Sequence, residues 1–483
     1  MVGAPRPRSG SHRHPGVDDS ALDRPRVQPP PLRRCPRRAP APARRRRRRV
    51  HLGQGDAGRG AGEHTGCLPS VDRRRPRRRV HRRRHTLPRR RDHPAHHGSS
   101  FSKEITVKVV VIGAGSLGLG AASRLVEAPG ADVVVLDKQH AAAGSSGRSA
   151  GVFSRLYNDA HDIALRIRTI ELIEQLADTQ GLTLRRIGLL RLARTPQDLD
   201  ALAASLETQT RLGVRSSRLL TPGELPDVVP ISTEGVLGAI HNAEDGYLDG
   251  AELCGAMAAK IREHGGQVRG QAEVTSVVRR PASGFRLELA DGTVLDADVV
   301  VNAAGAWAGP VGDLLDAPVA MANERHEAFV LQLPKAYAGP VLPMTMDYVV
   351  GADDPGVYFR HEGKDQVIAG MHSNSVVGHT DGDPEVSTAP TDEGAEEVLE
   401  RLARLLPDIE FGYRGGWTGI YPHSRTGTFV VGEHPATPGV FVVAGGGGIG
   451  VNMGPVLGEI VADQILYGAS RRFQIPDSWA PGR

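Results

Sequence analysis

The segment VKVVVIGAGSLG, residues 107–118, decides the fold of this chain. Its first six residues, Val107–Ile112, are all apolar and β-branched except Lys108, as is typical of a buried parallel strand. The glycines Gly113, Gly115 and Gly118 follow directly, in the G-x-G-x-x-G spacing of a dinucleotide-binding turn. Because glycine makes up 59 of the 483 residues, the spacing alone is weak evidence. The position of the glycines directly after a predicted strand makes a dinucleotide-binding turn the better interpretation.

The residues after this turn complete a strand–helix–strand unit. Leu119–Ala128 predicts a helix that must end before Pro129, and Ala131–Leu136 (ADVVVL) predicts a second buried strand. Asp137 ends that strand, 24 residues after Gly113. We therefore expect a βαβ unit of Rossmann type, in which the helix N-terminus faces a pyrophosphate and Asp137 accepts hydrogen bonds from a ribose. This unit alone does not separate FAD from NAD.

Charge divides the chain near residue 100. Residues 1–100 contain 28 arginines, no lysine and 7 acidic residues, a formal charge of +21, whereas the remainder carries −16. The arginine-rich segment has almost no apolar periodicity, so we expect it to be disordered. Three interpretations are open: a polyanion-binding tail, a mitochondrial transit peptide, or a translation start assigned too early in a GC-rich gene. We favour the last, because GC-rich codons yield arginine without lysine.

Cysteine content and hydropathy exclude several classes of protein. Beyond residue 100 the only cysteine is Cys254, so neither a disulfide framework nor a cysteine-based metal site is predicted. No segment is typical of a membrane span or of a secretory signal peptide. We therefore expect a cytoplasmic body without a metal, and we do not expect nucleic acid as its partner.

The rest of the chain alternates between helical and strand periodicity. Helices are predicted over His161–Gln180, Ala251–His264 and Thr391–Leu406, and a hairpin is predicted in which Phe285–Leu289 returns through Val294–Val301. Alternating strands between residues 321 and 371 suggest a second, mainly antiparallel domain inserted into the first. The expected order is three cofactor-binding segments at 105–185, 241–310 and 414–470, and two substrate-domain segments at 186–240 and 311–413.

Three further glycine-containing motifs follow the first turn. They are Gly144–Gly151 (GSSGRSAG), Asp298–Trp307 (DVVVNAAGAW) and Phe441–Gly450 (FVVAGGGGIG), the last leading into a helix expected to start near Gly454. Together the four motifs resemble the D-amino-acid oxidase and glycine/sarcosine oxidase superfamily of FAD enzymes, which includes sarcosine and dimethylglycine dehydrogenases. The resemblance covers about residues 107–466. It implies an α/β fold of the glutathione-reductase-2 type, with a Rossmann FAD-binding domain and an inserted, mainly antiparallel substrate domain.

The resemblance also implies which residues hold FAD. The N–H groups of Gly445–Gly448 and the dipole of the following helix are expected to stabilise negative charge on the reduced flavin ring, and the backbone of Val274 is expected to meet the adenine. No cysteine matches a flavin-attachment site, and Gly144–Gly151 contains no histidine, so we expect non-covalent FAD. The predicted cofactor residues are Gly113, Gly115, Ser116, Gly118, Asp137, Lys138, Ser145, Ser146, Arg148, Ser149, Ala150, Gly151, Val274, Ala304, Gly305, Trp307, Gly445, Gly447, Gly448, Ile449 and Gly450.

The substrate side needs a cation and a means of removing a proton. An alkylammonium nitrogen has no lone pair to expel a hydride, and deprotonating it at pH 7 costs roughly 5 kcal/mol. Arginine suits a substrate carboxylate because it pairs with both oxygens. The resemblance implies as candidate catalytic residues Arg360 as carboxylate anchor, Arg325 and His326 in a segment that lines the pocket in the dimethylglycine dehydrogenase branch, and Tyr247 near the substrate. His423 is a further candidate, as a base. A purely structural role is an open alternative for each.

The segment Trp417–Gly427 (WTGIYPHSRTG) departs from the family pattern, which commonly has an acidic residue before the last glycine and an arginine earlier. This chain has Arg425 and Tyr421 in the motif, so substrate identity does not carry over. We predict an FAD-dependent oxidase or dehydrogenase that oxidises the C–N bond of an amine or amino acid, of the sarcosine/N-methyl or D-amino-acid type. The alternatives are a 2-hydroxy-acid dehydrogenase and a non-catalytic or nucleic-acid-associated flavoprotein. Oxygen, a quinone and an electron-transfer flavoprotein are open as electron acceptor.

Overall fold

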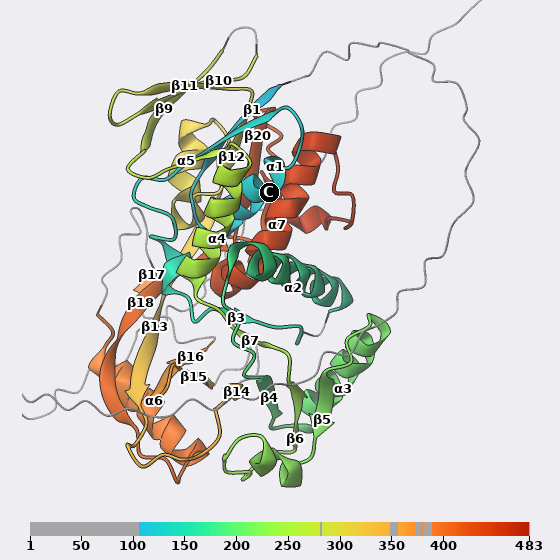
Figure 1. Ribbon diagram of the computed structural model, residues 1–483, viewed down its shortest axis with the longest axis vertical. Coiled ribbons are helices and arrows are strands. Elements are labelled where there is room, and N and C mark those ends of the chain that lie inside the picture. The colour runs from blue at the N-terminus through green and yellow to red at the C-terminus, as the bar shows by residue number, and fades with distance from the viewer. Residues whose placement is uncertain are drawn as a thin grey trace, which may run out of the picture. The chain divides into compact units, whose positions relative to one another are not determined.

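The computed structural model describes residues 106–157, 159–280, 283–347, 356–372, 378–379 and 389–482 (Figure 1). The expectations for residues 1–100 fall outside these ranges. No helix within the ranges is long and apolar enough to cross a membrane. Two large sheets organise the described part of the chain, and the candidate site lies between them.

The first large sheet is the Rossmann sheet, and it is parallel except at one edge. β1 pairs in parallel with β2 on one side and β12 on the other, with Val109 opposite Val133 and Val299. Only the edge strand β19 runs antiparallel to its neighbour, β20. The strand order is β19 (Val430–Glu433), β20 (Val440–Ala444), β12 (Val299–Asn302), β1 (Val107–Ile112), β2 (Ala131–Leu136) and β8 (Gln267–Arg269).

Both faces of this sheet are covered, which explains why β1 is apolar and buried on both sides from Val109 to Ile112. Val109 and Val111 pack in the cluster that holds helices on one face, and Val110 and Ile112 pack in a separate cluster on the other. The helices of the first face are α1 (Ser116–Leu125), α2 (Ala160–Gln180), α4 (Gly250–Glu263) and α7 (Gly450–Tyr467). The second face is covered by α5 (Ala308–Leu314) and by a three-stranded sheet of β9 (Val274–Arg279), β10 (Phe285–Leu289) and β11 (Val294–Ala297).

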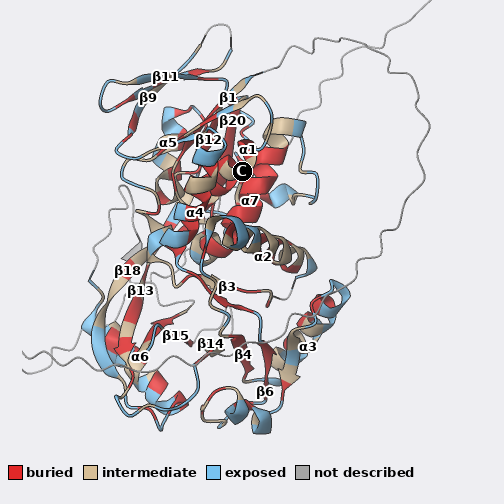
Figure 2. Ribbon diagram, viewed as in Figure 1, coloured by how far each residue is buried: buried red, intermediate tan, exposed pale blue. Residues whose placement is uncertain are grey.

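Helices α1 and α7 pack so closely that side chains are excluded from their contact. A Cβ at Gly458 would lie 2.2 Å from the Ala121 nitrogen, and one at Gly120 would lie 2.5 Å from the Gly454 carbonyl oxygen. Residues Val451–Asp463 of α7 are all buried, as the red core of Figure 2 shows. Because α1 follows the first glycine turn and α7 follows the last, this packing fixes the two turns relative to each other.

The second large sheet is mainly antiparallel and carries the substrate domain. Its core is closed by α6 (Asp392–Leu405), through Val398 and Leu402. Helix α3 (Pro196–Arg211) begins at a Thr195–Asp198 capping box. The order is β17 (Gly378–His379), β13 (Met321–Gln332), β16 (Gln366–Met371), β15 (Val357–Glu362), β14 (Met344–Asp347), β4 (Leu189–Ala193), β6 (Gly238–Asn242) and β5 (Ser217–Leu220), with β18 (Gly412–Ser424) also paired to β13.

The predicted fold class is confirmed, and the differences concern boundaries. The strand predicted over Val294–Val301 is two strands. The first, β11, pairs with β10 as far as Ala297, and the second, β12, pairs with β1 in the Rossmann sheet from Val299. α1 and α7 begin at Ser116 and Gly450, earlier than predicted, since each starts directly in its glycine turn. β18 belongs to the second sheet as far as Ser424, although the third cofactor segment was expected from residue 414.

Candidate active site

A cavity of about 930 Å³ extends from the carboxyl edge of the Rossmann sheet to the second sheet. All of the predicted cofactor residues line it except Gly118. Gly118 acts in packing instead, because a Cβ there would lie 2.1 Å from the carbonyl oxygen of Gly113. The single cavity therefore brings together the four glycine-containing motifs that the sequence spreads over more than 300 residues.

The first glycine turn requires glycine for two reasons. Gly113 has φ +112°, which side chains disfavour, and a Cβ there would lie 2.3 Å from the Ala303 carbonyl oxygen. The N-terminus of α1 follows at once, and its N-cap, Gly115, supplies no side-chain cap. The turn thus presents bare backbone and a helix N-terminus to the cavity, which is the arrangement that binds a pyrophosphate.

Asp137 and Lys138 lie at the end of β2, beside this turn. The Asp137 carboxylate is held by two backbone N–H groups, those of Ala114 and Gln139, each at 2.8 Å. The Lys138 ammonium lies 4.1 Å from the centre of the Trp307 ring. Asp137 and Lys138 both line the cavity, as do Glu273 and Val274 at the start of β9.

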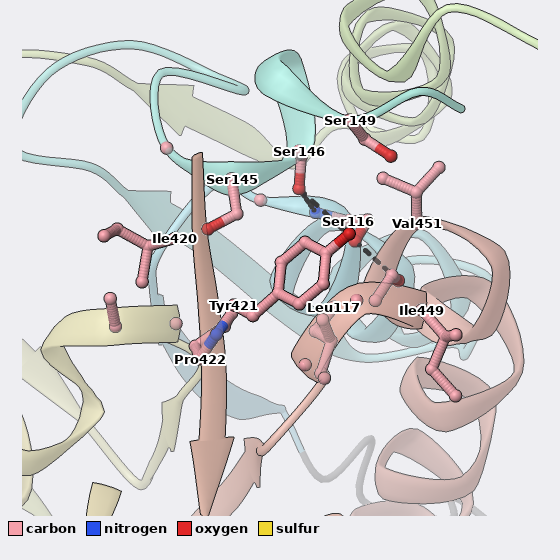
Figure 3. A pocket seen from close by; sticks show the side chains of 18 of the residues that line it. Ser116, Leu117, Ser145, Ser146, Ser149, Ile420, Tyr421, Pro422, Ile449 and Val451 are labelled. Atoms are coloured by element: carbon pink, nitrogen blue, oxygen red, sulfur yellow. Dashed lines mark hydrogen bonds between the residues drawn. The ribbon is translucent and has the colours of Figure 1, made fainter. Parts of the chain in front are cut away.

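The serine-rich segment, Gly144–Gly151, helps to link the first glycine turn to the last through hydrogen bonds (Figure 3). Ser146 Oγ accepts a hydrogen bond from the Ser116 N–H at 3.0 Å, and Ser116 Oγ donates to the Gly450 carbonyl at 2.9 Å. Ser145 and Ser149 lie in the same segment and line the cavity. This chain of hydrogen bonds couples the N-terminal ends of α1 and α7, where two helix dipoles point into one space.

Two aromatic rings from β18 lie against the last glycine turn. A Cβ at Gly447 would lie 2.5 Å from His423 Cε1, and one at Gly448 would lie 2.6 Å from Tyr421 Cε2. Both rings line the cavity, and Figure 3 shows Tyr421 beside the glycine turn that contains Ile449. The departure in the 417–427 motif therefore changes the wall of the site itself.

An acid–histidine cluster extends from these rings onto β13. His326 stacks on Tyr421 with ring centres 4.0 Å apart. Glu324 Oε2 lies 3.3 Å from His326 Nε2 and 3.6 Å from His423 Nε2. Burial lowers the pKa of His326 below its ordinary value, and the neighbouring Glu324 carboxylate opposes that shift. The lowered pKa favours the neutral form of His326 near pH 7.

Two arginines that sequence analysis did not single out also line the cavity. Arg166 comes from α2 and Arg191 from β4, and His372 lies at the end of β16. Burial, reinforced by Arg191 and His326, lowers the pKa of His372 to about 4. The sequence held a signal for both arginines, because each interrupts an apolar stretch: LLRLA in β4, and the buried face of α2 that carries Ile163 and Ile170.

The other candidate catalytic residues lie apart from the cavity wall. Arg360 Nη1 pairs with Glu362 at 2.5 Å, its Nε donates to the Ala150 carbonyl at 2.9 Å, and its guanidinium lies 3.6 Å from the Tyr247 ring centre. Neither Arg360 nor Tyr247 lines the cavity. Arg325 does not line it either, because neighbours on a strand face opposite sides and His326 takes the cavity side. His326 and His423 are the two candidates that the structure brings together.

The comparisons with known proteins agree with this geometry. The model of the FAD dependent oxidoreductase family, DAO, matches residues 108–464. The chain belongs to this family. Glycine oxidase of Geobacillus kaustophilus is 27% identical over 370 residues, which cover 74% of this chain and 92% of that protein. Human dimethylglycine dehydrogenase is 25% identical over 375 residues, and there the match covers only 42% of the relative.

Solved structures share the fold of this FAD-dependent oxidoreductase. The L-proline dehydrogenase of P. horikoshii superposes with a TM-score of 0.66 at 24% identity, covering 76% of this chain and 95% of that one. The residues present fit FAD: bare glycine turns at both ends of the cavity, two helix N-termini, and a carboxylate fixed at the end of β2. A dinucleotide needs these features, because its pyrophosphate and ring must approach the backbone closely.

Proposed function

We propose that this protein oxidises the C–N bond of an amine or amino acid, of the sarcosine/N-methyl or D-amino-acid type, with FAD bound non-covalently. The observation that carries the proposal is that one cavity holds both the cofactor turns and the Glu324–His326–His423 cluster. Relatives named glycine oxidase, dimethylglycine dehydrogenase and sarcosine dehydrogenase support the substrate class. FAD supplies a two-electron acceptor for the hydride of the carbon beside the nitrogen.

The acid–histidine cluster removes the ammonium proton in this proposal. His326 donates from Nε2 to Glu324, which leaves Nδ1 to accept the proton. The stacked Tyr421 ring holds the imidazole in place, and its low exposure keeps it neutral before it acts. Arg325, the neighbour of His326 on β13, does not line the cavity and takes no part in this proposed step.

Arg191 replaces Arg360 as the proposed anchor of the substrate carboxylate. Arg191 lines the cavity on β4, near enough to His372 to shift that imidazole's pKa. Arg360 is already engaged by Glu362 and Ala150 and stacks on Tyr247, so both residues are assigned to holding the strand beside the serine segment. A guanidinium pairs with both oxygens of a carboxylate and so fixes the orientation of the carbon to be oxidised.

Non-covalent attachment of FAD is supported by the burial and low reactivity of Cys254, the one cysteine in the described ranges. Burial raises the pKa of the Cys254 thiol to about 12, which makes it a poor nucleophile, and it does not line the cavity. Acid precipitation of the yellow protein should therefore release FAD into the supernatant. Flavin that stays with the pellet would contradict this part of the proposal.

The reaction itself is tested by anaerobic mixing of the purified holoprotein with three sets of compounds. N-methyl amino acids and D-amino acids should bleach the flavin absorbance, whereas 2-hydroxy acids should leave it unchanged. Bleaching by hydroxy acids alone would replace the proposal with the alternative alcohol oxidation. No bleaching by any set would exclude both reactions.

A further inference from the structure

Arg166 occupies an unusual position for an arginine. It lies on the inner face of α2, between the buried residues Ile163 and Ile170, and only 4% of its surface is exposed. It nevertheless lines the cavity rather than the protein core. Placing a guanidinium in such a position is costly unless an anion accompanies it.

Among the described residues, Arg166 has an aromatic ring beside it but no carboxylate in ion-pair contact. Its guanidinium lies 4.5 Å from the centre of the Tyr157 ring, and its Nε has no hydrogen-bond partner in the part of the chain that the structure describes. Arg168, two residues further on, shows the contrast, because its Nε and Nη2 donate to the two Glu459 oxygens at 2.8 and 2.6 Å. A ring under the flat face of a guanidinium leaves the N–H edge available to an acceptor in its plane.

The nearby carboxylates do not neutralise Arg166 directly. Asp245 is fully buried and is bound by Arg155 Nη1 at 2.9 Å and by Ser154 Oγ at 3.0 Å. Asp162, one turn earlier on α2, also lines the cavity, and burial raises its pKa. Within the described ranges neither carboxylate forms an ion pair with Arg166. Burial lowers the pKa of Arg166 and the nearby Arg191 adds to this shift, whereas the charges of Asp162 and Asp245 oppose it. Arg166 and Arg191 both line the cavity, so the two cations face one space.

We infer that Arg166 and Arg191 form paired anion subsites, so that the preferred substrate is an amine bearing two carboxylates, such as an N-carboxyalkyl or N-methyl acidic amino acid. Arg191 binds one carboxylate from β4, and Arg166 binds the second from α2 through the N–H edge that Tyr157 leaves available. That the ligand is oxidised rests on the proposed function, whereas the existence of the second subsite does not.

The test compares a dicarboxylate with a monocarboxylate that cannot reduce the flavin. Glutarate and butyrate are titrated into the holoprotein, and the change in flavin absorbance gives each dissociation constant. Glutarate should bind at least about 10-fold more tightly than butyrate, since a charge-assisted hydrogen bond in a desolvated site is worth about that ratio or more. In Arg166→Met this preference should fall about 10-fold or more, whereas Arg168→Met, which breaks the Glu459 pair on the same helix, should keep it.

Arg166→Lys covers the case in which the methionine variant fails to fold. It keeps the charge but loses the planar fork, so the glutarate preference should fall several-fold. A preference that is absent in the unmodified protein, or unchanged in the Arg166 variants, overturns the inference.

The same titration separates this inference from the proposed reaction. If no amine bleaches the flavin but the glutarate preference depends on Arg166, the reaction is wrong and the subsite stands. If sarcosine bleaches it while glutarate shows no preference, the reaction stands and the subsite is wrong. In the outcome that supports both, iminodiacetate has a higher kcat/KM than sarcosine, and Arg166→Met narrows that difference.

Discussion

The two ends of the cavity are built from different materials. The cofactor end consists of backbone, with glycine turns at 113 and 445, two helix N-termini and a carboxylate held by N–H groups. The substrate end, where we propose that the amine binds, consists of long side chains on separate elements: Arg166 on α2, Arg191 on β4 and His326 on β13. Backbone can be altered only by changing the fold, whereas each side chain can be replaced alone. The two ends should therefore respond differently to substitution.

The largest effect is expected at the cofactor end, from Gly113→Ala. The new Cβ would lie 2.3 Å from the Ala303 carbonyl oxygen at φ +112°, so the turn must shift by more than the fold allows. We expect protein without bound flavin and a loss of stability of about 3 kcal/mol or more. Visible absorbance and urea unfolding measure both quantities.

Gly255→Ala is the matched control for that change. Gly255 lies inside α4 with no atom within 4 Å of a new Cβ. The Gly255→Ala protein should therefore bind FAD as the unmodified protein does and be more stable by about 0.5–1 kcal/mol. Yellow Gly113→Ala protein with unchanged affinity for FAD would contradict the backbone account of the cofactor end.

The second prediction concerns a single side chain at the substrate end. Arg191→Met should keep its FAD, because Arg191 contributes no part of the glycine turns, but kcat/KM for carboxylate substrates should fall about 100-fold. Neutral amines should be affected far less. Arg360→Met is the comparison, since Arg360 lies outside the cavity wall and should affect both kinds of substrate alike. If kcat/KM for carboxylate substrates falls selectively in the Arg360 variant and not in the Arg191 variant, Arg360 is the carboxylate anchor and the proposal for Arg191 is wrong.

The smallest effect is a pH dependence that arises at the substrate end. The pKa of His372 is lowered to about 4 from its ordinary 6.5, so the folded state binds its proton less readily than the unfolded state. The contribution to stability is therefore complete above about pH 6.5 and is lost as the pH falls toward 4. The shift sets an upper limit of about 3 kcal/mol, of which about 2 kcal/mol is lost between pH 7 and pH 4.5, because folded His372 is only partly protonated at pH 4.5.

Urea unfolding of the protein and of His372→Asn at pH 7 and pH 4.5 measures this difference. The variant should lose about 2 kcal/mol less than the unmodified protein over that interval. Identical losses would mean that water already hydrates His372 in the folded state.

The glycine turns at one end of the cavity could be predicted from the sequence, for a physical reason. A pyrophosphate must approach backbone, so its binding turn needs glycines at fixed positions between a buried strand and a helix, and that pattern is local. The four motifs and nearly all the predicted cofactor residues do line one cavity. Gly118 differs only because its close neighbour is the turn itself.

Which side chains line the substrate end of the cavity depends on the tertiary structure and could not be predicted from the sequence. Arg360 and Tyr247 were predicted to contact substrate, but Arg360 pairs with Glu362, two residues further along β15, and donates to the Ala150 carbonyl. Arg166 and Arg191, 25 residues apart on different elements, meet because α2 and β4 converge on the same cavity. Whether a charged side chain binds a ligand or an internal partner depends on which neighbours the fold brings within a few ångströms. The sequence encodes those neighbours only through the whole fold.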